Sequence, residues 1–252
     1  MSLIVDRLSI AGPHGALLPP TSFTAPPGQV TLVAGDPGPS GTALALAIGG
    51  RMSGCTGVVA LDTDARPRIR RKAVALVDVP DVTEPEPSLS LRVVIGEELA
   101  LAGKSASLAE IYRFIGSHVA DLQEGGATSQ LHATPTTEAS DIDPEEEPAA
   151  RRAKEKLLRE RHIAYGKAVA SRRWDTVPPA ARVAWLTGFA EQHRGVKVLV
   201  LTHPDRWGGN PHDWYRTAAQ AAAAGNIVVV ICTHASVRLL GRPLRHELGV
   251  AA

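Results

Sequence analysis

The stretch "GDPGPSGT", residues 35–42, combines residue types that hold phosphate groups in proteins. It follows the apolar run "VTLVA", and its glycines allow the backbone to approach an anion closely. A helix that starts here would direct free N–H groups at the anion, and a Ser or Thr hydroxyl would be a ligand for Mg²⁺. The candidate nucleotide-binding residues are therefore Gly35, Gly38, Ser40, Gly41 and Thr42, and Thr42 is also the candidate Mg²⁺ ligand.

The same stretch lacks the lysine that reaches the outer phosphates in such loops, and Gly41 takes its place. Pro37 and Pro39 remove two N–H donors, and Asp36 adds a negative charge near the anion. A turn without a function is the competing interpretation of this stretch when it is taken by itself.

The loop lies among elements that predict an α/β fold. Near-continuous apolar runs rich in β-branched residues indicate buried strands of a sheet that is covered on both faces. These runs are residues 30–34, 73–77, 196–201 and 227–232. Helices are predicted between them at residues 42–48, 107–122, 177–193 and 211–224. Strands that alternate with helices predict a mostly parallel sheet flanked by helices.

Capping residues support three of these helices. Ser107 and Glu110 form a capping box at the start of the second helix. Thr176 is the expected N-cap of the third helix, and Asn210 precedes Pro211 at the start of the fourth.

Length and charge limit the function classes. The chain has 252 residues, enough for one sizeable core or two small ones, and a formal net charge of +1. So small a charge creates no field for nucleic acid or an anionic membrane, so we expect no nucleic-acid partner. We expect no signal peptide and no membrane span, since no apolar run approaches about 20 residues. Cys232 is expected to be a buried small hydrophobe, which fits a reducing, cytoplasmic compartment.

One segment departs from the α/β pattern. Residues 123–150 contain no lysine or arginine and several Asp and Glu residues, and we interpret them as an acidic flexible linker. The basic helical stretch "RRAKEKLLRERH" follows at once. This helix is either a solvated face, a surface over which the acidic linker folds, or a contact for a partner.

Three blocks of the sequence resemble the ATP-binding-cassette (ABC transporter) ATPase family. "SFTAPPGQVTLVAGDPGPSGTALALAIGG" with "GCTGVVALD" is similar to the opening of these proteins. "VKVLVLTHP" resembles their Walker B strand, and "AAAAGNIVVVICTHA" resembles the strand that ends in the switch histidine, here His234. The resemblance covers most of residues 1–250 except the linker. It implies a single P-loop NTPase-like nucleotide-binding domain over residues 1–252, with a helical subdomain at 88–186.

The resemblance places several of the family's chemical groups on residues that cannot replace them. The Walker A lysine falls on Gly41 and the Mg²⁺ hydroxyl on Thr42. The Mg²⁺ aspartate and the general-base glutamate of the Walker B strand fall on Thr202 and His203, and the proline that follows is kept as Pro204. The resemblance therefore implies a degenerate member, a pseudo-ATPase that hydrolyses ATP very slowly or not at all.

The remaining family motifs are also altered. The signature "LSGGQ" corresponds to "DTVPPAA", with Thr176 near its serine and no glycine pair. Asp78 stands near the Q-loop glutamine, and Asn210 is nearest to the D-loop aspartate. His14 is the candidate for stacking on adenine. His203 and His234 are the candidate catalytic residues, since histidine exchanges a proton near neutral pH. The alternatives are a structural neighbour of the loop for His203 and a locally bonded strand-end residue for His234.

Three functions remain open on the sequence. The first is an ABC-transporter-like ATP-binding subunit, with ATP and Mg²⁺ as possible ligands. It would dock on an integral membrane permease from the cytoplasmic face and pair with itself or with a second cassette. The second is a non-catalytic cassette-fold scaffold or regulator. The third is a divergent active ATPase that takes its phosphate cation from Arg70, Arg71 or Lys72.

Overall fold

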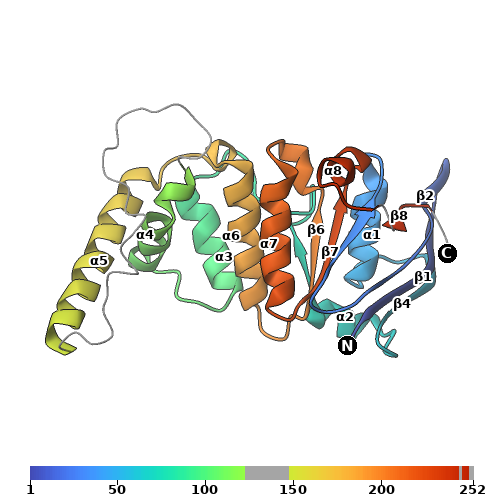
Figure 1. The fold of residues 1–252 in the computed structure, drawn as a ribbon, viewed down its shortest axis with the longest axis horizontal. Helices are drawn as coiled ribbons and strands as arrows, with labels where there is room; N and C mark the ends of the chain where they lie inside the picture. Colours follow the sequence, from blue (N-terminus) through green and yellow to red (C-terminus); the bar gives the residue numbers. More distant parts are fainter. Residues whose placement is uncertain (123–147, 244–245, 250–252) are drawn as a thin grey trace. The chain divides into compact units, whose positions relative to one another are not determined.

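The structure is a computed structural model that describes residues 1–122, 148–243 and 246–249 (Figure 1). It divides into two compact units. The first contains Met1–Glu84 and Arg182–Ala252, and the second contains Pro85–Ala181. The single nucleotide-binding domain and the helical subdomain at residues 88–186 stay predictions.

A five-stranded parallel sheet forms the centre of the first unit. Its order is β5-β6-β7-β3-β8, which confirms the predicted mostly parallel α/β fold. Ala34 pairs with Cys232 and Thr202 pairs with Ile231, so the carboxyl ends of β3, β6 and β7 lie side by side. The strands are β3 (Val30–Ala34), β5 (Val74–Val77), β6 (Val198–Thr202), β7 (Ile227–Cys232) and β8 (His246–Glu247).

A three-stranded antiparallel sheet completes the first unit, in the order β2-β1-β4. At the start of β1, Leu3 and Val5 are buried and Ile4 between them is not fully buried, as the alternation of a half-covered strand requires. A single cluster of buried apolar side chains joins this sheet, the parallel sheet and the first helix. The strands are β1 (Leu3–Gly12), β2 (Gly15–Ala25) and β4 (Cys55–Leu61).

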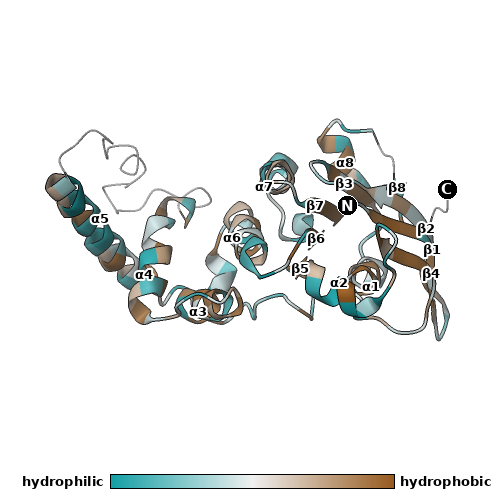
Figure 2. Ribbon diagram, turned by 90° about the horizontal axis from the view of Figure 1, so that it is seen from below, coloured by the Kyte–Doolittle hydropathy of each residue, from teal (hydrophilic) through white to brown (hydrophobic). Residues whose placement is uncertain are grey.

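Helices cover both faces of the parallel sheet. Figure 2 shows α1 on one side of β3 and β7 and α7 on the other, with the apolar colour concentrated on the strands between them. Cys232 in β7 is fully buried, as predicted, and burial raises the pKa of its thiol to about 12. The helical elements are α1 (Pro39–Ile48), α2 (Pro67–Ala73), α6 (Pro179–Gln192), η3 (Pro204–Trp207), α7 (Pro211–Ala223) and α8 (His234–Leu239).

The second unit is helical. Ser107 caps α4, because its hydroxyl accepts a hydrogen bond from the Glu110 amide at 3.3 Å, as predicted. The helix expected over residues 107–122 is interrupted at His118, where α4 ends and a 3₁₀ turn follows. The elements are α3 (Leu91–Leu101), α4 (Leu108–Ser117), η1 (Val119–Leu122), α5 (Pro148–Val169) and η2 (Trp174–Thr176).

One sequence prediction about this region is wrong. Thr176 does not cap α6: it ends η2, and its hydroxyl donates to the Arg173 carbonyl at 2.7 Å. Two prolines follow, and the helix begins at the second of them, Pro179. Of the predicted linker, residues 148–150 form the first turn of α5, and residues 123–147 lie outside the described part of the chain.

Helices α4 and α5 pack through glycines. A Cβ atom on Gly116 would lie closer than 3.0 Å to the His162 carbonyl, and one on Gly166 would lie as close to the Tyr112 carbonyl. Real Cβ atoms essentially never approach backbone so closely, so both positions require glycine. The first half of α5 is exposed and hydrophilic (Figure 2), and whether its basic face is solvated, covered by the linker or bound by a partner stays a prediction.

Candidate functional site

The loop after β3 leads into α1 without a side-chain cap. Gly38 is the N-cap residue, no side chain bonds the first amides of α1, and Pro39 occupies the first turn. The first amides of a helix lack intrahelical acceptors, so this turn has N–H groups for an anion. The Ser40 hydroxyl is already used, because it donates to the Leu17 carbonyl at 2.7 Å. Thr42 is half-buried in the same turn.

The residues after β8 lie against the start of the loop. The Leu248 amide donates to the Ala34 carbonyl at 2.8 Å, and the Gly249 amide donates to the Thr21 hydroxyl at 3.0 Å. A Cβ on Gly35 would come closer than 3.0 Å to the Leu248 side chain. A side chain at position 35 would therefore require Leu248 to move.

His203, the first residue after β6, reaches into the loop. A Cβ on Gly41 would lie closer than 3.0 Å to Nε2 of the His203 imidazole. The ring thus fills the space in which a side chain at position 41 would begin. His203 takes a left-handed backbone conformation, with φ of 48°, and its amide donates to the Ile231 carbonyl at 2.7 Å. The backbone of β7 therefore helps to hold the ring against Gly41.

The His203 imidazole is enclosed and short of partners. Only 6% of the residue is exposed, and Nε2 has no hydrogen-bond partner among the described residues. Burial lowers the pKa of His203, with Arg206 acting in the same direction and Asp205 opposing. Asp205 Oδ1 lies 4.0 Å from Nδ1. The ring is therefore held in its neutral form near neutral pH.

Asp205 is a carboxylate close to His203, but it is bonded to the start of α8. Its Oδ2 accepts hydrogen bonds from the Thr233 amide at 2.8 Å, the Thr233 hydroxyl at 2.6 Å and the Ser236 hydroxyl at 2.7 Å. These three bonds join the end of β6 to the turn that follows β7. Oδ2 therefore holds these two connections together, whereas the buried Oδ1 has no hydrogen-bond partner among the described residues.

Asp78, the residue after β5, is engaged in the same way. Its Oδ1 forms an ion pair with Arg206 Nη2 at 2.8 Å, and its Oδ2 accepts from Trp207 Nε1 at 3.1 Å. Arg206 also donates to the Thr202 and His203 carbonyls at 2.9 and 3.2 Å. The ends of β5 and β6 are therefore fastened to each other by side chains.

His234, the first residue of α8, faces two carboxylates. Its Nε2 lies 2.7 Å from Glu247 Oε1 in a hydrogen bond, and its Nδ1 lies 3.8 Å from Asp36 Oδ1. Glu247 comes from β8 and Asp36 from the loop. This mouth of the loop therefore carries two negative charges beside one histidine.

Comparison with solved structures decides the fold. An ABC transporter ATP-binding protein from Pyrococcus furiosus matches with a TM-score of 0.56 and 10% identity, over 93% of this chain and 92% of that chain. A nucleotide-free ATP-binding cassette from an ABC transporter matches with a TM-score of 0.54 and 15% identity, over 95% and 84%. The chain has the fold of the ATP-binding-cassette ATPases. No family model and no curated protein matches the sequence.

In this cassette fold, Gly41 and His203 stand at the places of the Walker A lysine and the general base, according to the resemblance. The structure brings the two residues into contact and buries the histidine. The other catalytic candidate, His234, lies at the mouth of the loop and bonds to Glu247 instead. Sequence reasoning did not identify Asp205, Glu247 or Leu248, because each owes its place to pairing between strands that are distant in the chain.

The end of β6, which the resemblance equates with the Walker B strand, does not fit a Mg²⁺ ion. β6 ends at Thr202 and His203 follows it, and neither residue is a carboxylate. The next carboxylate, Asp205, uses its Oδ2 at the start of α8, and its buried Oδ1 lies beside the His203 ring. Mg²⁺ in nucleotide sites is bound through carboxylates together with phosphates and waters. Among the described residues, no group of three or more His, Cys, Asp and Glu side chains could hold a metal ion.

Arg70 and Arg71, the arginines predicted as possible phosphate-binding cations for the loop, lie at the other end of α1. Arg70 is buried and donates to the Ile48 carbonyl at 3.2 Å, and Arg71 donates to the Gly50 carbonyl at 2.7 Å. These carbonyls belong to the C-terminal end of α1, about 15 Å from its first turn for a helix of this length. Lys72 is exposed in the last turn of α2. Arg70 and Arg71 therefore cannot serve a phosphate at the loop.

The last two candidates occupy peripheral positions. His14 is exposed in the turn between β1 and β2. Asn210 caps α7, since its side-chain oxygen accepts from the His212 amide at 3.0 Å. Asn210 therefore has a structural role of its own in the described chain.

Proposed function

We propose that this chain is a cassette subunit that docks on an integral membrane permease at the inner face of the membrane. It pairs there with a second copy or with a different cassette. Its own loop binds ATP through the backbone of the first turn of α1 and hydrolyses it at a negligible rate. The names of the solved structures with the same fold, which are ATP-binding subunits of ABC transporters, support the class.

The observation that carries the proposal is the contact between His203 and Gly41. Hydrolysis needs cations on the transferred phosphoryl group and a group that orients the attacking water. The ring fills the space in which a side chain at position 41 would begin, and its Nε2 is buried without a hydrogen-bond partner among the described residues. Removing one preorganised donor for the transition state typically slows catalysis about 10²–10³-fold. This chain lacks the lysine and both Walker B carboxylates.

Nucleotide binding is a weaker demand than hydrolysis. The first turn of α1 retains N–H groups that no side chain caps, and a helix N-terminus attracts phosphate. Asp36 and Glu247 oppose an anion at the mouth of the loop. We therefore expect ATP to bind weakly, without a requirement for Mg²⁺.

We propose that the chain reaches the membrane by docking on a partner. In the described part of the chain, no helix is long and apolar enough to span a bilayer. A permease partner would supply the membrane attachment and the transport specificity. When a tagged chain is expressed with its genomic neighbours, we expect it in the membrane fraction, released by an alkaline carbonate wash. A chain found wholly in the soluble fraction under these conditions would contradict the docking.

A second function, a scaffold that needs no nucleotide, is favoured by one feature. The polar side chains Asp78, Asp205 and His234 are all bonded within the chain. A cassette whose polar side chains are bonded to one another in this way keeps its shape without a ligand. A divergent active ATPase has no such support, because Arg70 and Arg71 lie at the wrong end of α1.

Two measurements on the purified chain test these proposals. Phosphate release from ATP with Mg²⁺ should not exceed that of a heat-denatured sample, and rapid Mg²⁺-dependent turnover would overturn the non-hydrolysing subunit. Calorimetry with ATP then separates the two functions. Heat of binding without Mg²⁺ supports the nucleotide-binding subunit, and no heat up to about 5 mM ATP, equivalent to less than about 3 kcal/mol of binding free energy, supports the scaffold.

A further inference from the structure

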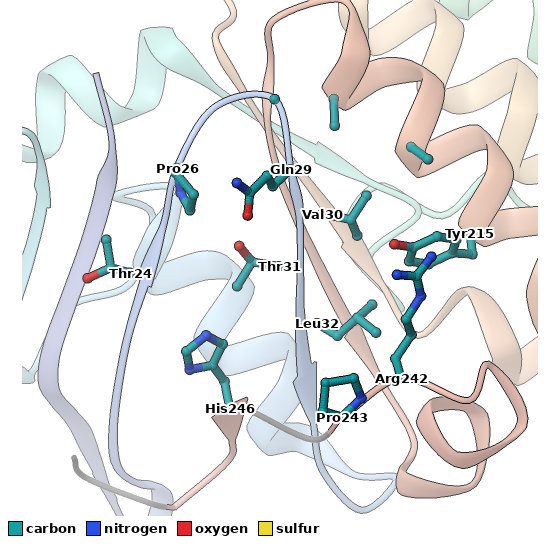
Figure 3. Close-up of a pocket in the computed structure, with 13 residues that line it drawn as sticks. Thr24, Pro26, Gln29, Val30, Thr31, Leu32, Tyr215, Arg242, Pro243 and His246 are labelled. Carbon is teal, nitrogen blue, oxygen red and sulfur yellow. The ribbon is translucent and has the colours of Figure 1, made fainter.

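A cavity of about 490 Å³ lies along the edge of β3, within the first unit (Figure 3). It is lined by the first three residues of the strand, Val30–Leu32, whereas the nucleotide loop follows the last residue, Ala34. Small-molecule sites usually enclose about 300–1,000 Å³, so the size is that of a ligand site. The lining residues are Thr24, Pro26, Gly28, Gln29, Val30, Thr31, Leu32, Tyr215, Ala219, Ala222, Arg242, Pro243 and His246.

The strand edge itself forms part of the cavity wall. β3 pairs with β7 over Val30–Ala34, but in the described chain it pairs with β8 only at Val33 and Ala34. The other edge of Val30–Leu32 therefore faces the cavity without a described strand neighbour. Backbone N–H and C=O groups on such an edge need partners, and a ligand in the cavity could supply them.

The strand divides the cavity into a polar side and an apolar side, as Figure 3 shows. Successive strand residues point to opposite faces, so Thr31 projects to one side and Val30 and Leu32 to the other. Thr24 and Gln29 join Thr31 on the polar side. On the apolar side, Ala219 and Ala222 of α7 keep space open, because their side chains are short.

Arg242 gives the cavity its charge. Its guanidinium carbon lies 5.0 Å from the centre of the Tyr215 ring, which fixes the cation against the apolar side. Arg242 is exposed, and it forms no ion pair with any residue that the structure describes. The lining contains one arginine and no Asp or Glu. Its fixed charge therefore favours an anion over a cation.

We propose that this cavity is a binding site for a small organic anion, a carboxylate or phosphate group on a flat apolar body. Arg242 binds the anionic group, the apolar body lies over Val30 and Leu32, and polar substituents bond to Thr31 and the free strand edge. The site is separate from the nucleotide loop and does not depend on nucleotide binding.

The test uses benzoate and phenyl phosphate as probes and benzamide as an uncharged probe of similar size. Binding to the full chain is followed by calorimetry and by the amide resonances of a ¹⁵N-labelled sample. We expect both anions to shift the resonances of Thr31, Leu32 and Tyr215, with benzamide at least about tenfold weaker. Binding of one anion only, at these same residues, also supports the site and identifies the preferred anionic group.

Variants assign the charge recognition to Arg242. Arg242→Gln should weaken anion binding about tenfold or more, and Arg242→Lys should restore part of it, since lysine keeps the charge but not the planar fork. Arg238→Gln, which removes an exposed charge on α8 outside the lining, is the matched control and should bind as the parent does. Thr31→Val should weaken probes with a polar substituent, such as 4-hydroxybenzoate, more than benzoate.

Three results would overturn the proposal. One is the absence of binding by any probe up to about 10 mM, which corresponds to less than about 3 kcal/mol. Another is a set of shifts confined to residues 35–42, because phosphate would then occupy the nucleotide loop. The third is equal loss of affinity in the Arg242→Gln and Arg238→Gln variants, which would indicate attraction by general charge.

Discussion

The imidazole of His203 lies where a side chain at Gly41 would begin. His203 follows β6, and Gly41 lies in the first turn of α1. In the family that the sequence resembles, these two segments carry the Walker A and Walker B residues. Gly41→Ala should therefore destabilise the fold, by about 1–3 kcal/mol, because the ring must move. Chemical denaturation of the purified variants measures this change.

Two further variants make that measurement specific. Gly188→Ala places a methyl group on α6 where no atom lies within 4 Å, so it should leave stability unchanged or raise it by up to about 1 kcal/mol. His203→Asn shortens the side chain and keeps a residue type that tolerates positive φ. Gly41→Ala should cost less in the His203→Asn background. Equal costs in both backgrounds would show that the ring does not restrict position 41.

Stability should fall as the solution becomes acidic, in part through His203. Its pKa in the folded chain is lowered, chiefly by burial, relative to about 6.5 in the unfolded chain. The unfolded state therefore binds the proton more readily. The stabilising contribution is present above about pH 6.5 and is lost as the pH falls toward the folded-state pKa, at about 1.4 kcal/mol for each unit of lowering.

Urea denaturation between pH 8 and pH 5 measures this dependence. Burial also lowers the pKa of His193, which acts with the same sign, so the parent must be compared with His203→Asn. The variant should lose less stability on acidification than the parent. Parallel stability profiles would rule out His203 as a contributor.

Glu247→Gln should tighten ATP binding about three- to tenfold at neutral pH, if the loop binds nucleotide as proposed. The change removes a negative charge from the mouth of the loop, so a phosphate is repelled less there. Calorimetry with ATP measures the effect, and Asp36→Asn should act in the same direction. Asp213→Asn on α7 is the control. Unchanged affinity for Glu247→Gln would place the bound phosphate away from His234.

Gly166→Ala should separate α4 from α5. The new methyl group would meet the Tyr112 carbonyl, which is backbone and cannot rotate away, so we expect a loss of about 2–3 kcal/mol within the second unit. Hydrogen exchange should show faster exchange for the amides of α4 and α5. Gly96→Ala is the comparison, because its Cβ would lie 3.1 Å from a terminal carbon of Ile111, which is flexible. Equal exchange in the two variants would contradict a tight backbone contact.

The parallel sheet could be predicted because burial on both faces leaves a direct mark on the sequence. β3 and β7 have the predicted bounds, and both are uninterrupted apolar runs. The ends of the helices were predicted less accurately than the strands. His118 ends α4 although the apolar spacing continues through Leu122, and Thr176 lost its expected capping role to a 3₁₀ turn before two prolines. Competition between local turns and the helix decides where a helix ends, and the spacing of apolar residues does not reveal the outcome.

Only part of the candidate site could be predicted from the sequence. The residues of the loop could be named from the spacing of glycines, and its missing lysine was visible at once. The position of His203 against Gly41 could not be read, since it depends on the register of β6 beside β7 and on a left-handed residue after the strand. The same is true of Glu247 and Leu248, which reach the loop through the pairing of β8 with β3.

The contact between His203 and Gly41 also restricts which neighbouring sequences are viable. A lysine acquired at position 41 brings a Cβ atom into an occupied space, so that single change lowers stability before any phosphate is gained. A route to a hydrolytic loop must first replace His203 with a smaller residue, which by itself brings no catalytic benefit. The two positions therefore restrict each other, because a side chain can be added at position 41 without strain only after His203 has changed.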